Sequence, residues 1–378
     1  MSGIYIHIPF CKQACNYCDF HFSTSLKRKD EMVLALAKEI AMRKDELGDD
    51  DVIETIYFGG GTPSILDISD LRFLIDEVYE NYKVVANPEI TIEANPDDLS
   101  ESRIIELSNT RINRLSIGIQ SFFEEDLQLM NRAHDSEEAK KCLEIAVQYF
   151  DNISIDLIYG TPGMSNECWL QNIKTALDLK IPHISSYALT VEPKTALHKL
   201  IQKGSIPQPD DEQAHQQFLI LVDTLEANGF VHYELSNFAK ENYFSKNNSA
   251  YWLGKKYIGI GPSAHSYDGK NRSWNVANNI LYIKSIQDHK LPSENEILTV
   301  ADRYNEYVMT GLRTIWGVSL ERIEKEFGCD YMNYLLENAQ KYLDEGKLEI
   351  QDNVLKTTRK GKFFSDGIAS DLFFINLF

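Results

Sequence analysis

Across residues 1–240, short apolar runs alternate with longer amphipathic stretches. In the stretches 30–47, 69–82 and 136–150, apolar residues recur at spacings of three and four, which predicts helices. The runs between them are almost continuously apolar, a pattern typical of parallel strands covered by helices on both faces. We therefore expect strands at 4–8, 52–58, 89–93, 114–119, 153–158 and 183–189.

This alternation of strands and helices predicts one architecture. Parallel βα units joined by right-handed crossovers curve into a barrel, so the expected fold class is α/β, a partial (β/α)6 barrel of the TIM type. In such barrels the chemistry lies on the loops that follow the carboxyl ends of the strands. Reactive residues are therefore expected on those loops.

The end of the chain has a different pattern, in which helical stretches are followed by a hairpin that turns at Asp352-Asn353. The helices are expected at 299–314, 319–327 and 331–346, and the hairpin at 348–355. This order predicts a winged-helix-like helical module. We expect a barrel domain at 1–240, a linker with a heme-motif-like segment at 241–290 and a C-terminal domain at 291–378.

The balance of charge narrows the classes of partner. Acidic residues (57) outnumber basic residues (38), and the net charge of −19 repels nucleic acid and anionic membrane surfaces. The C-terminal module has one concentrated basic patch, formed by Lys356, Arg359, Lys360 and Lys362. We therefore expect this module to cover a substrate or dock a partner rather than to bind DNA.

The sequence predicts a cytoplasmic protein without a membrane span. It has no uncharged apolar run of about 18 residues, the length that a membrane-spanning helix needs. Its N-terminus lacks the basic region and apolar core of a signal peptide. Three of the six cysteines are crowded at one end, which is no disulfide framework and fits a reducing compartment.

The crowded cysteines follow the first predicted strand. Cys11, Cys15 and Cys18 have the spacing Cys-x3-Cys-x2-Cys, which brings three thiols onto one tight loop. A [4Fe–4S] cluster held by three cysteines leaves one iron open to an outside ligand, and S-adenosylmethionine is a cofactor of radical chemistry. With His21, the same residues also match a structural zinc site, and buried cysteines often act as small hydrophobes. The spacing alone leaves these alternatives open.

Glycines and polar residues follow the later strands as well. The run Gly59-Gly60-Gly61-Thr62 allows a backbone to approach a ligand closely, although a tight turn has the same composition. A carboxylate at Glu93 is suited to accept hydrogen bonds from ribose hydroxyls. Similar positions hold Gln120, Arg132, Asp156 and Ala188. Each could be a capping or core group, but their recurrence at strand ends indicates a ligand site.

Together these motifs resemble the radical S-adenosylmethionine (radical SAM) superfamily. The cysteine triad and Gly-Gly-Gly-Thr-Pro carry the general resemblance. Further motifs resemble the branch that contains oxygen-independent coproporphyrinogen III oxidase and the heme chaperone HemW. They are Tyr-Ile-His-Ile-Pro-Phe-Cys at 5–11, Glu-Ala-Asn-Pro at 93–96, Ser-Ile-Gly-Ile-Gln-Ser at 116–121, Asn-Arg-Ala-His at 131–134 and Asp-Leu-Ile-Tyr-Gly at 156–160.

The resemblance implies roles for the matching residues. Cys11, Cys15 and Cys18 would ligate a [4Fe–4S] cluster, whose open iron takes the amino and carboxylate groups of S-adenosylmethionine. Tyr5 and Tyr17 would lie beside the cluster and this cofactor. The cofactor would also contact Gly60, Gly61, Thr62, Glu93, Gln120, Arg132, Asp156 and Ala188. No catalytic residue is implied.

Two features favour the chaperone over the oxidase. Chains of the oxidase type resemble one another in a Cys-x3-Cys-x2-Cys-x-Cys pattern that follows a longer leading segment. This chain has Phe20 at the position of the fourth cysteine and ten residues before Cys11. A third feature opposes them: chaperone-type chains share a His-Asn-x-x-Tyr-Trp motif associated with heme. Here Asn247 replaces the histidine, and an amide is a poor ligand for heme iron. Tyr251, Trp252 or His265 are the remaining residues able to contact a porphyrin.

The sequence thus predicts a radical SAM protein that binds heme and passes it to an acceptor such as a respiratory enzyme. Its expected partners are heme or a porphyrin, the acceptor and an electron donor such as flavodoxin. The alternative is an enzyme, the oxygen-independent coproporphyrinogen III oxidase. A second alternative is a zinc-stapled binding protein.

Overall fold

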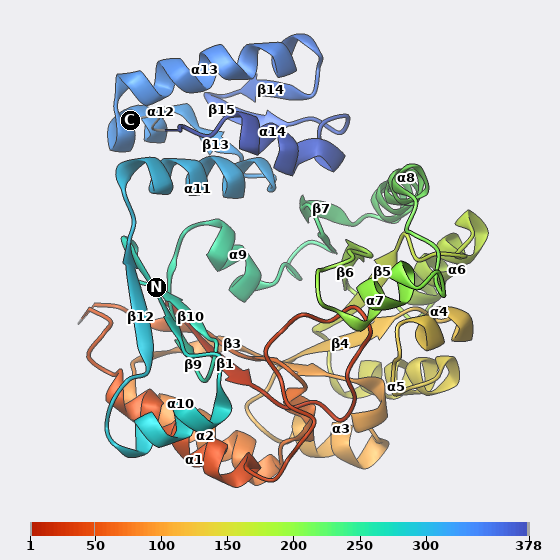
Figure 1. Ribbon diagram of the computed structural model, residues 1–378, viewed down its shortest axis with the longest axis vertical. Helices are drawn as coiled ribbons and strands as arrows, with labels where there is room; N and C mark the ends of the chain where they lie inside the picture. Colours follow the sequence, from red (N-terminus) through yellow and green to blue (C-terminus); the bar gives the residue numbers. More distant parts are fainter. Residues whose placement is uncertain (1, 49, 376–378) are drawn as a thin grey trace.

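The computed structural model of the chain describes residues 2–48 and 50–375. Its centre is a sheet in which six parallel strands lie side by side in chain order (Figure 1). These strands are β1 (Ser2–Ile8), β2 (Ile53–Gly60), β3 (Val84–Ala94), β4 (Arg114–Gln120), β5 (Ile153–Tyr159) and β6 (His183–Ala188). The predicted α/β class and the six predicted parallel strands are confirmed.

Helices connect these strands and cover the sheet. Most of the buried apolar side chains of these helices pack on the strands in one large hydrophobic core. Local capping residues start several of them: at α5, for example, the Asp135 carboxylate and Glu138 form a reciprocal capping box. The connecting helices are α1 (Lys29–Met42), α2 (Ile68–Asn81), α3 (Glu101–Ser108), α4 (Glu124–Leu129), α5 (Ser136–Tyr149), α6 (Asn166–Asp178), α7 (Ala196–Gln202) and α8 (Asp211–Ala227), with the short 3-10 helices η1 (Pro63–Ile65) and η2 (Pro96–Asp98).

Within residues 2–48 and 50–375, the sheet continues beyond the six predicted strands at both edges and has twelve strands. Two short antiparallel strands follow β6, and four strands extend the sheet from β1. The first pair is β8 (Asn237–Ala239) and β7 (Val231–Glu234), and the four are β9 (Lys256–Ile260), β10 (His265–Tyr267), β11 (Asn271–Asn275) and β12 (Ser293–Ile297).

The prediction of a linker at 241–290 is therefore wrong. These residues form α9 (Lys246–Trp252), strands β9 to β11 and α10 (Asn279–Gln287). Strand β9 pairs in parallel with β1, and the buried Glu39 carboxylate of α1 accepts hydrogen bonds from Asn275 and Tyr282. Because this pairing joins the segment to β1 and α1, it is part of the barrel. The proposed outer limits of the two domains stay a prediction.

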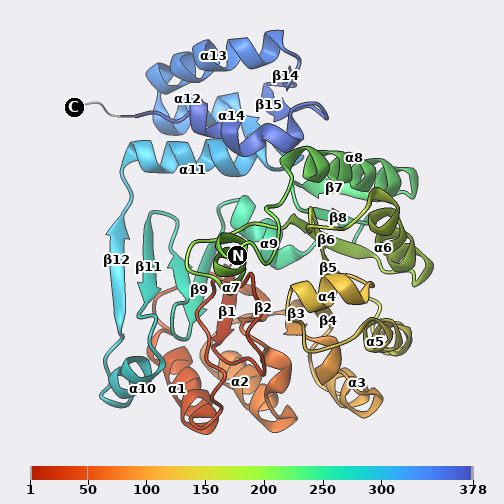
Figure 2. The ribbon, with the colours of Figure 1, turned by 45° about the vertical axis from the view of Figure 1, so that its right-hand side comes forward.

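The C-terminal module has its own hydrophobic core. Figures 1 and 2 show it stacked on the barrel, with β12 leading up to α11. Asp352 and Asn353 both have positive φ, as the predicted tight hairpin turn requires. The module comprises α11 (Val300–Leu312), β13 (Val318–Ser319), α12 (Leu320–Phe327), α13 (Cys329–Asp344), β14 (Leu348–Gln351), β15 (Val354–Thr357), η3 (Lys362–Phe364) and α14 (Ser365–Asp371).

Charged contacts fix this module to the barrel. Arg313 pairs with the buried Glu234 of β7 at 3.0 Å. Two residues of the predicted basic patch are also engaged, since Lys362 donates to a backbone carbonyl of β7 and Arg359 pairs with Asp223. The module thus directs part of its positive charge at the barrel. Among residues 2–48 and 50–375, we find no helix with the length and apolar character of a membrane span.

Candidate functional site

The cysteine loop follows β1 and is held at both its base and its tip. Backbone hydrogen bonds join Cys11 to Ser23 and Ser23 to Pro9, which closes the base of the loop. At the tip, the Asn16 amide side chain donates to the carbonyl of Leu129 at 2.7 Å. The hydrogen bonds that hold the loop at its base and tip therefore do not involve the three thiol sulfurs.

The three thiols are half-buried and have polar neighbours. The Arg132 guanidinium donates to Cys15 Sγ at 3.2 Å, and the Thr62 side chain hydrogen-bonds Cys11. Burial raises the pKa of the Cys18 thiol to about 11. Burial also raises the pKa of Cys11, while the Thr62 hydrogen bond and the Arg132 charge oppose this effect and favour the thiolate that binds iron.

The two metal hypotheses require different arrangements of the three thiols. Within the described part of the chain, no three His, Cys, Asp or Glu side chains are placed to share one metal ion. A structural zinc site needs four ligands on a single ion, whereas each cysteine of a [4Fe–4S] cluster binds a different iron. A [4Fe–4S] cluster therefore does not require Cys11, Cys15 and Cys18 to converge on one ion.

The glycine turn after β2 lies directly against the start of the cysteine loop. Gly61 donates to the carbonyl of Ile8 at 2.9 Å, and a Cβ there would lie 2.5 Å from the carbonyl oxygen of Phe10. Gly60 has φ +102°, and its Cβ would lie 2.4 Å from the His7 ring. This turn thus requires glycine at both positions, and its backbone lies close to the start of the cysteine loop.

We expect Gly60→Ala to lower the stability of the apo protein by about 2 kcal/mol or more, because the new methyl group meets His7 and the backbone is strained. Urea unfolding measures the change. Gly163→Ala is a suitable control, since it shares a positive φ but meets nothing within 4 Å. Equal losses in the two variants would show that the contact with His7 is unimportant.

Glu93 lies at the carboxyl end of β3, beside the glycine turn. Its carboxylate accepts hydrogen bonds from the Tyr57 hydroxyl at 2.8 Å and the Gly60 backbone N–H at 3.1 Å. Burial raises the pKa of Glu93 to about 7, and the negative charge of Asp156 adds to the effect. Burial likewise raises the pKa of Asp156 to about 6. Two carboxyl groups with raised pKa values near a cavity are typical of a functional site.

A cavity of about 520 Å³ opens beside Glu93. Its lining includes Tyr5 and Gly60, so it brings together three of the predicted cofactor-binding residues. Phe20, at the position of the oxidase's fourth cysteine, also lines it and is 68% exposed. Other lining residues come from the segment after α8, namely Tyr251, Tyr257 and His265.

The other predicted residues surround this cavity or the cysteine loop to different degrees. Tyr17 packs with a small apolar cluster under the loop, and Gln120 is buried with φ 68° at the end of β4. Arg132 also donates to the carbonyl of Gly118 at 2.7 Å. Ala188 ends β6 opposite Tyr159, and no described contact connects it to the thiols.

Several residues of the site were not predicted from the sequence. His7 supports the glycine turn and bonds Tyr5 and the carbonyl of His21 through its two ring nitrogens. Asn95 accepts a hydrogen bond from Arg132 at 2.7 Å. His7 and Asn95 lie within motifs quoted above, so their positions in those motifs were the available signal. Arg114 is also buried, but it lies in none of those motifs, so no sequence signal pointed to it.

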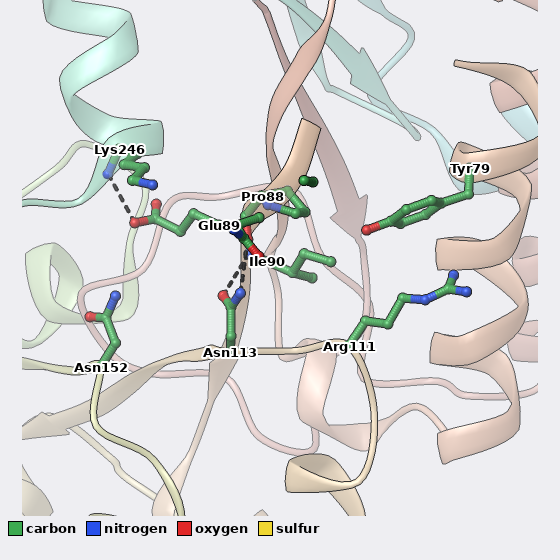
Figure 3. A pocket seen from close by; sticks show the side chains of 10 residues that line it. Tyr79, Pro88, Glu89, Ile90, Arg111, Asn113, Asn152 and Lys246 are labelled. Carbon is green, nitrogen blue, oxygen red and sulfur yellow. Dashed lines mark hydrogen bonds between the residues drawn. The ribbon is translucent and has the colours of Figure 1, made fainter. Parts of the chain in front are cut away.

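Asn247 does not line this cavity, although its side chain is hydrogen-bonded to Tyr251, which does. It is 3% exposed, and its side-chain oxygen accepts a hydrogen bond from Thr55 in the amino-terminal half of β2. The Glu89 carboxylate caps α9, the helix that contains Asn247, by accepting hydrogen bonds from the backbone N–H groups of Lys246 and Asn247. Figure 3 shows Glu89 and Lys246 at a separate pocket of about 620 Å³, near Asn113 before β4. In this conformation, position 247 is inaccessible to a cofactor.

Comparisons with known proteins identify the family of this chain. Residues 5–189 match the radical SAM superfamily, and residues 298–364 match the HemN C-terminal domain. The heme chaperone HemW of Bacillus subtilis is 34% identical over 97% of this chain and 98% of its own. HemW of Mycobacterium tuberculosis is 31% identical over 98% of this chain and 94% of its own.

A solved structure shares the whole fold. The coproporphyrinogen III oxidase HemN of Escherichia coli, a radical SAM enzyme, superimposes with a TM-score of 0.85 over 98% of this chain and 90% of its own, at 24% identity. At this identity the match concerns the fold alone. The sequence matches decide the family: this chain belongs to the radical SAM superfamily and, within it, to the family of the heme chaperone HemW.

Proposed function

We propose that this chain is a heme chaperone, which binds heme and passes it to an acceptor protein such as a respiratory enzyme. The observation that carries the proposal is the similarity to HemW over nearly the full length of both chains. The cavity beside Glu93 supports it, because aromatic side chains with a few polar groups suit a flat, mostly apolar ligand.

The proposed resident cofactors are a [4Fe–4S] cluster on Cys11, Cys15 and Cys18, and S-adenosylmethionine. The residues fit this pair. A glycine turn that a Cβ would block lies against the cysteine loop, and the buried Arg132 Nε has no hydrogen-bond partner among the described residues. Bound S-adenosylmethionine supplies radical chemistry, whatever use the protein makes of it.

The chain's own residues would position this cofactor. Gly60, Gly61 and Thr62 would let the cofactor approach the backbone closely beside the thiols, while Tyr5 and Tyr17 would exclude water from the cluster. The Glu93 carboxylate is suited to accept hydrogen bonds from the ribose hydroxyls of the cofactor. We assign Gln120, Arg132 and Asp156 to the remaining wall, with Ala188 as the residue least supported by contacts. An electron donor such as flavodoxin would reduce the cluster, and a reducing cytoplasm would preserve its thiols.

Coproporphyrinogen III oxidase activity is the competing function, since that enzyme has the same fold. The exposed Phe20 at the position of the oxidase's fourth cysteine argues against it. The test is anaerobic reconstitution followed by heme titration, with the Soret band and retention through gel filtration as readouts. Retention supports the chaperone. Loss of heme on the column, together with formation of protoporphyrinogen from coproporphyrinogen III, would establish the oxidase.

We expect Asn247→His to leave heme binding unchanged and to destabilise the protein. The larger imidazole must enter a packed site and loses the hydrogen bond with Thr55, which costs about 1–3 kcal/mol. Urea unfolding and heme titration of the same preparation measure the two effects. Tighter heme binding by the variant would mean that position 247 becomes accessible and that its histidine ligates heme.

A further inference from the structure

One face of the extended sheet carries a continuous row of aromatic and basic side chains. Residues directly opposite each other on antiparallel strands point to the same side, as do residues two apart on one strand. Strand pairing places His265 opposite Trp274, and Tyr267 opposite both Arg272 and Tyr257. We call these five residues, His265, Tyr267, Tyr257, Arg272 and Trp274, the aromatic face.

The aromatic face joins two cavities. The larger, of about 520 Å³, is lined by His265 and Tyr257 and reaches Glu93. The smaller, of about 240 Å³, lies between the sheet and the C-terminal module and is lined by Tyr257, Tyr267 and Arg272. Tyr251 and Tyr257 line both cavities, with ring centroids 4.6 Å apart. The face therefore runs from the cofactor end of the barrel to the module.

His265 is the imidazole on this face that is available to a metal. Three histidines line the larger cavity, but His7 has both ring nitrogens in hydrogen bonds and His21 Nε2 lies 2.8 Å from Asn279. Within the described chain, the His265 ring makes no hydrogen bond and its residue is exposed. Partial desolvation of the ring and the positive charge of Arg272 lower the His265 pKa, which keeps the ring in the neutral form that binds iron.

The small cavity at the other end of the face is lined by arginines suited to carboxylates. Arg272 pairs with Glu306 at 2.9 Å, and Arg322 lies over the Tyr307 ring at 4.2 Å while pairing with Glu326. The Arg303 guanidinium lines the same small cavity and has no hydrogen bond or ion pair among the described residues. A half-buried, unpaired guanidinium in a cavity that tyrosines also line is a donor for an anionic group.

We propose that heme docks on the aromatic face, with His265 as the axial iron ligand and Arg303 holding a propionate. The proposal rests on the heme-binding function proposed above. The ligand's chemistry matches the order of groups along the face: a metal at the centre of an apolar ring, and carboxylates at one edge. Arg272 lies opposite Tyr267, which is two residues from His265 on β10. The positions of Arg272 and His265 are therefore about 7 Å apart along the strand direction. The face thus supplies an iron ligand to this chain, in which Asn247 replaces the histidine of the heme-associated motif.

The first test uses the reconstituted full-length protein and compares His265→Asn with His289→Asn. His289 is an exposed histidine beyond the end of α10, so it controls for the loss of a surface imidazole. We expect His265→Asn to weaken heme retention at least tenfold and to remove the histidine–iron signature from resonance Raman and EPR spectra. The control should match the wild type, and thermal unfolding checks that both variants fold.

The second test probes the carboxylate end. Arg303→Gln should weaken heme binding by roughly tenfold or more, as expected for loss of a charge-assisted hydrogen bond. It should not affect binding of the heme dimethyl ester, whose propionates carry no charge. Arg72→Gln, an exposed change on α2, is the matched control.

The outcomes separate the two proposals. Failure of the wild type to retain heme would overturn the chaperone function and the docking site together. Heme retained equally by the wild type and His265→Asn, with the same axial-ligand spectrum, would overturn the docking site alone. Equal weakening of heme and ester by Arg303→Gln would overturn the propionate contact.

Discussion

Replacing Cys15 by alanine should abolish the iron–sulfur cluster while the protein stays folded. Three thiols hold the proposed cluster, and a third of its protein ligands would be lost. The loop should keep its shape, because Asn16 and Asn131 anchor it through hydrogen bonds that do not involve sulfur. After anaerobic reconstitution, we expect iron to fall from about four atoms per chain to nearly none, with loss of the charge-transfer absorbance.

Cys329→Ala provides the matched control for this experiment. Cys329 is an exposed thiol on α13, remote in sequence from the loop, and its removal should leave the iron content unchanged. Metal analysis of the same samples also measures zinc. One zinc per chain in the wild type, lost in Cys15→Ala, would replace the cluster hypothesis by a zinc site.

Glu93→Gln should have opposite effects on cofactor binding and on stability. The variant loses the charged acceptor proposed for the ribose hydroxyls, so S-adenosylmethionine should bind roughly 10- to 100-fold more weakly. Glutamine can keep both contacts of the carboxylate if the Tyr57 hydroxyl turns to accept from the new amide. Anaerobic calorimetry on the reconstituted protein measures the affinity.

The stability effect follows from the raised pKa of Glu93. The pKa is about 7 in the folded chain, against an ordinary value of 4.5. As pH rises from about 4.5 to 7, the unfolded state releases this proton before the folded state does, so the free energy of unfolding falls. Below that range both states are protonated and the effect vanishes. Above pH 7, Glu93→Gln should therefore stabilise the apo protein by about 1–3 kcal/mol.

Urea unfolding at pH 5 and pH 8 tests this expectation. The wild type should lose more stability between the two values than the variant, although Asp156 contributes a similar loss in both. Glu144→Gln, an exposed change on α5, should behave as the wild type. A variant less stable than the wild type at pH 8 would show that the contacts of the carboxylate outweigh its desolvation.

Much of the fold could be predicted because it depends on short windows of sequence. Apolar runs such as 153–158 coincide with a strand to within a residue, since a buried parallel strand has a distinctive composition. The turn at Asp352-Asn353 is local too, because both residues tolerate positive φ. The cysteine loop and the glycine turn were found in the same way, from spacing within a few positions.

The segment after α8 could not be predicted in this manner. Its strands are short, and β9 is stabilised by pairing with β1, more than two hundred residues earlier. Asn247 illustrates the same limit. Its place in a heme-associated motif suggested contact with the ligand, yet α9 buries it against Thr55 and Glu89.

The sequence by itself determined the order of βα units, the cysteine loop at the carboxyl end of β1 and the helical module at the end of the chain. Periodicity, capping and turn chemistry specify these features locally. Only the tertiary structure decided that Arg132 lies on Cys15, 117 residues away, and that Arg303 of α11 lines a cavity together with Tyr257, Tyr267 and Arg272 of the aromatic face. Such contacts depend on how distant strands pair and how the module packs, and no local pattern records them.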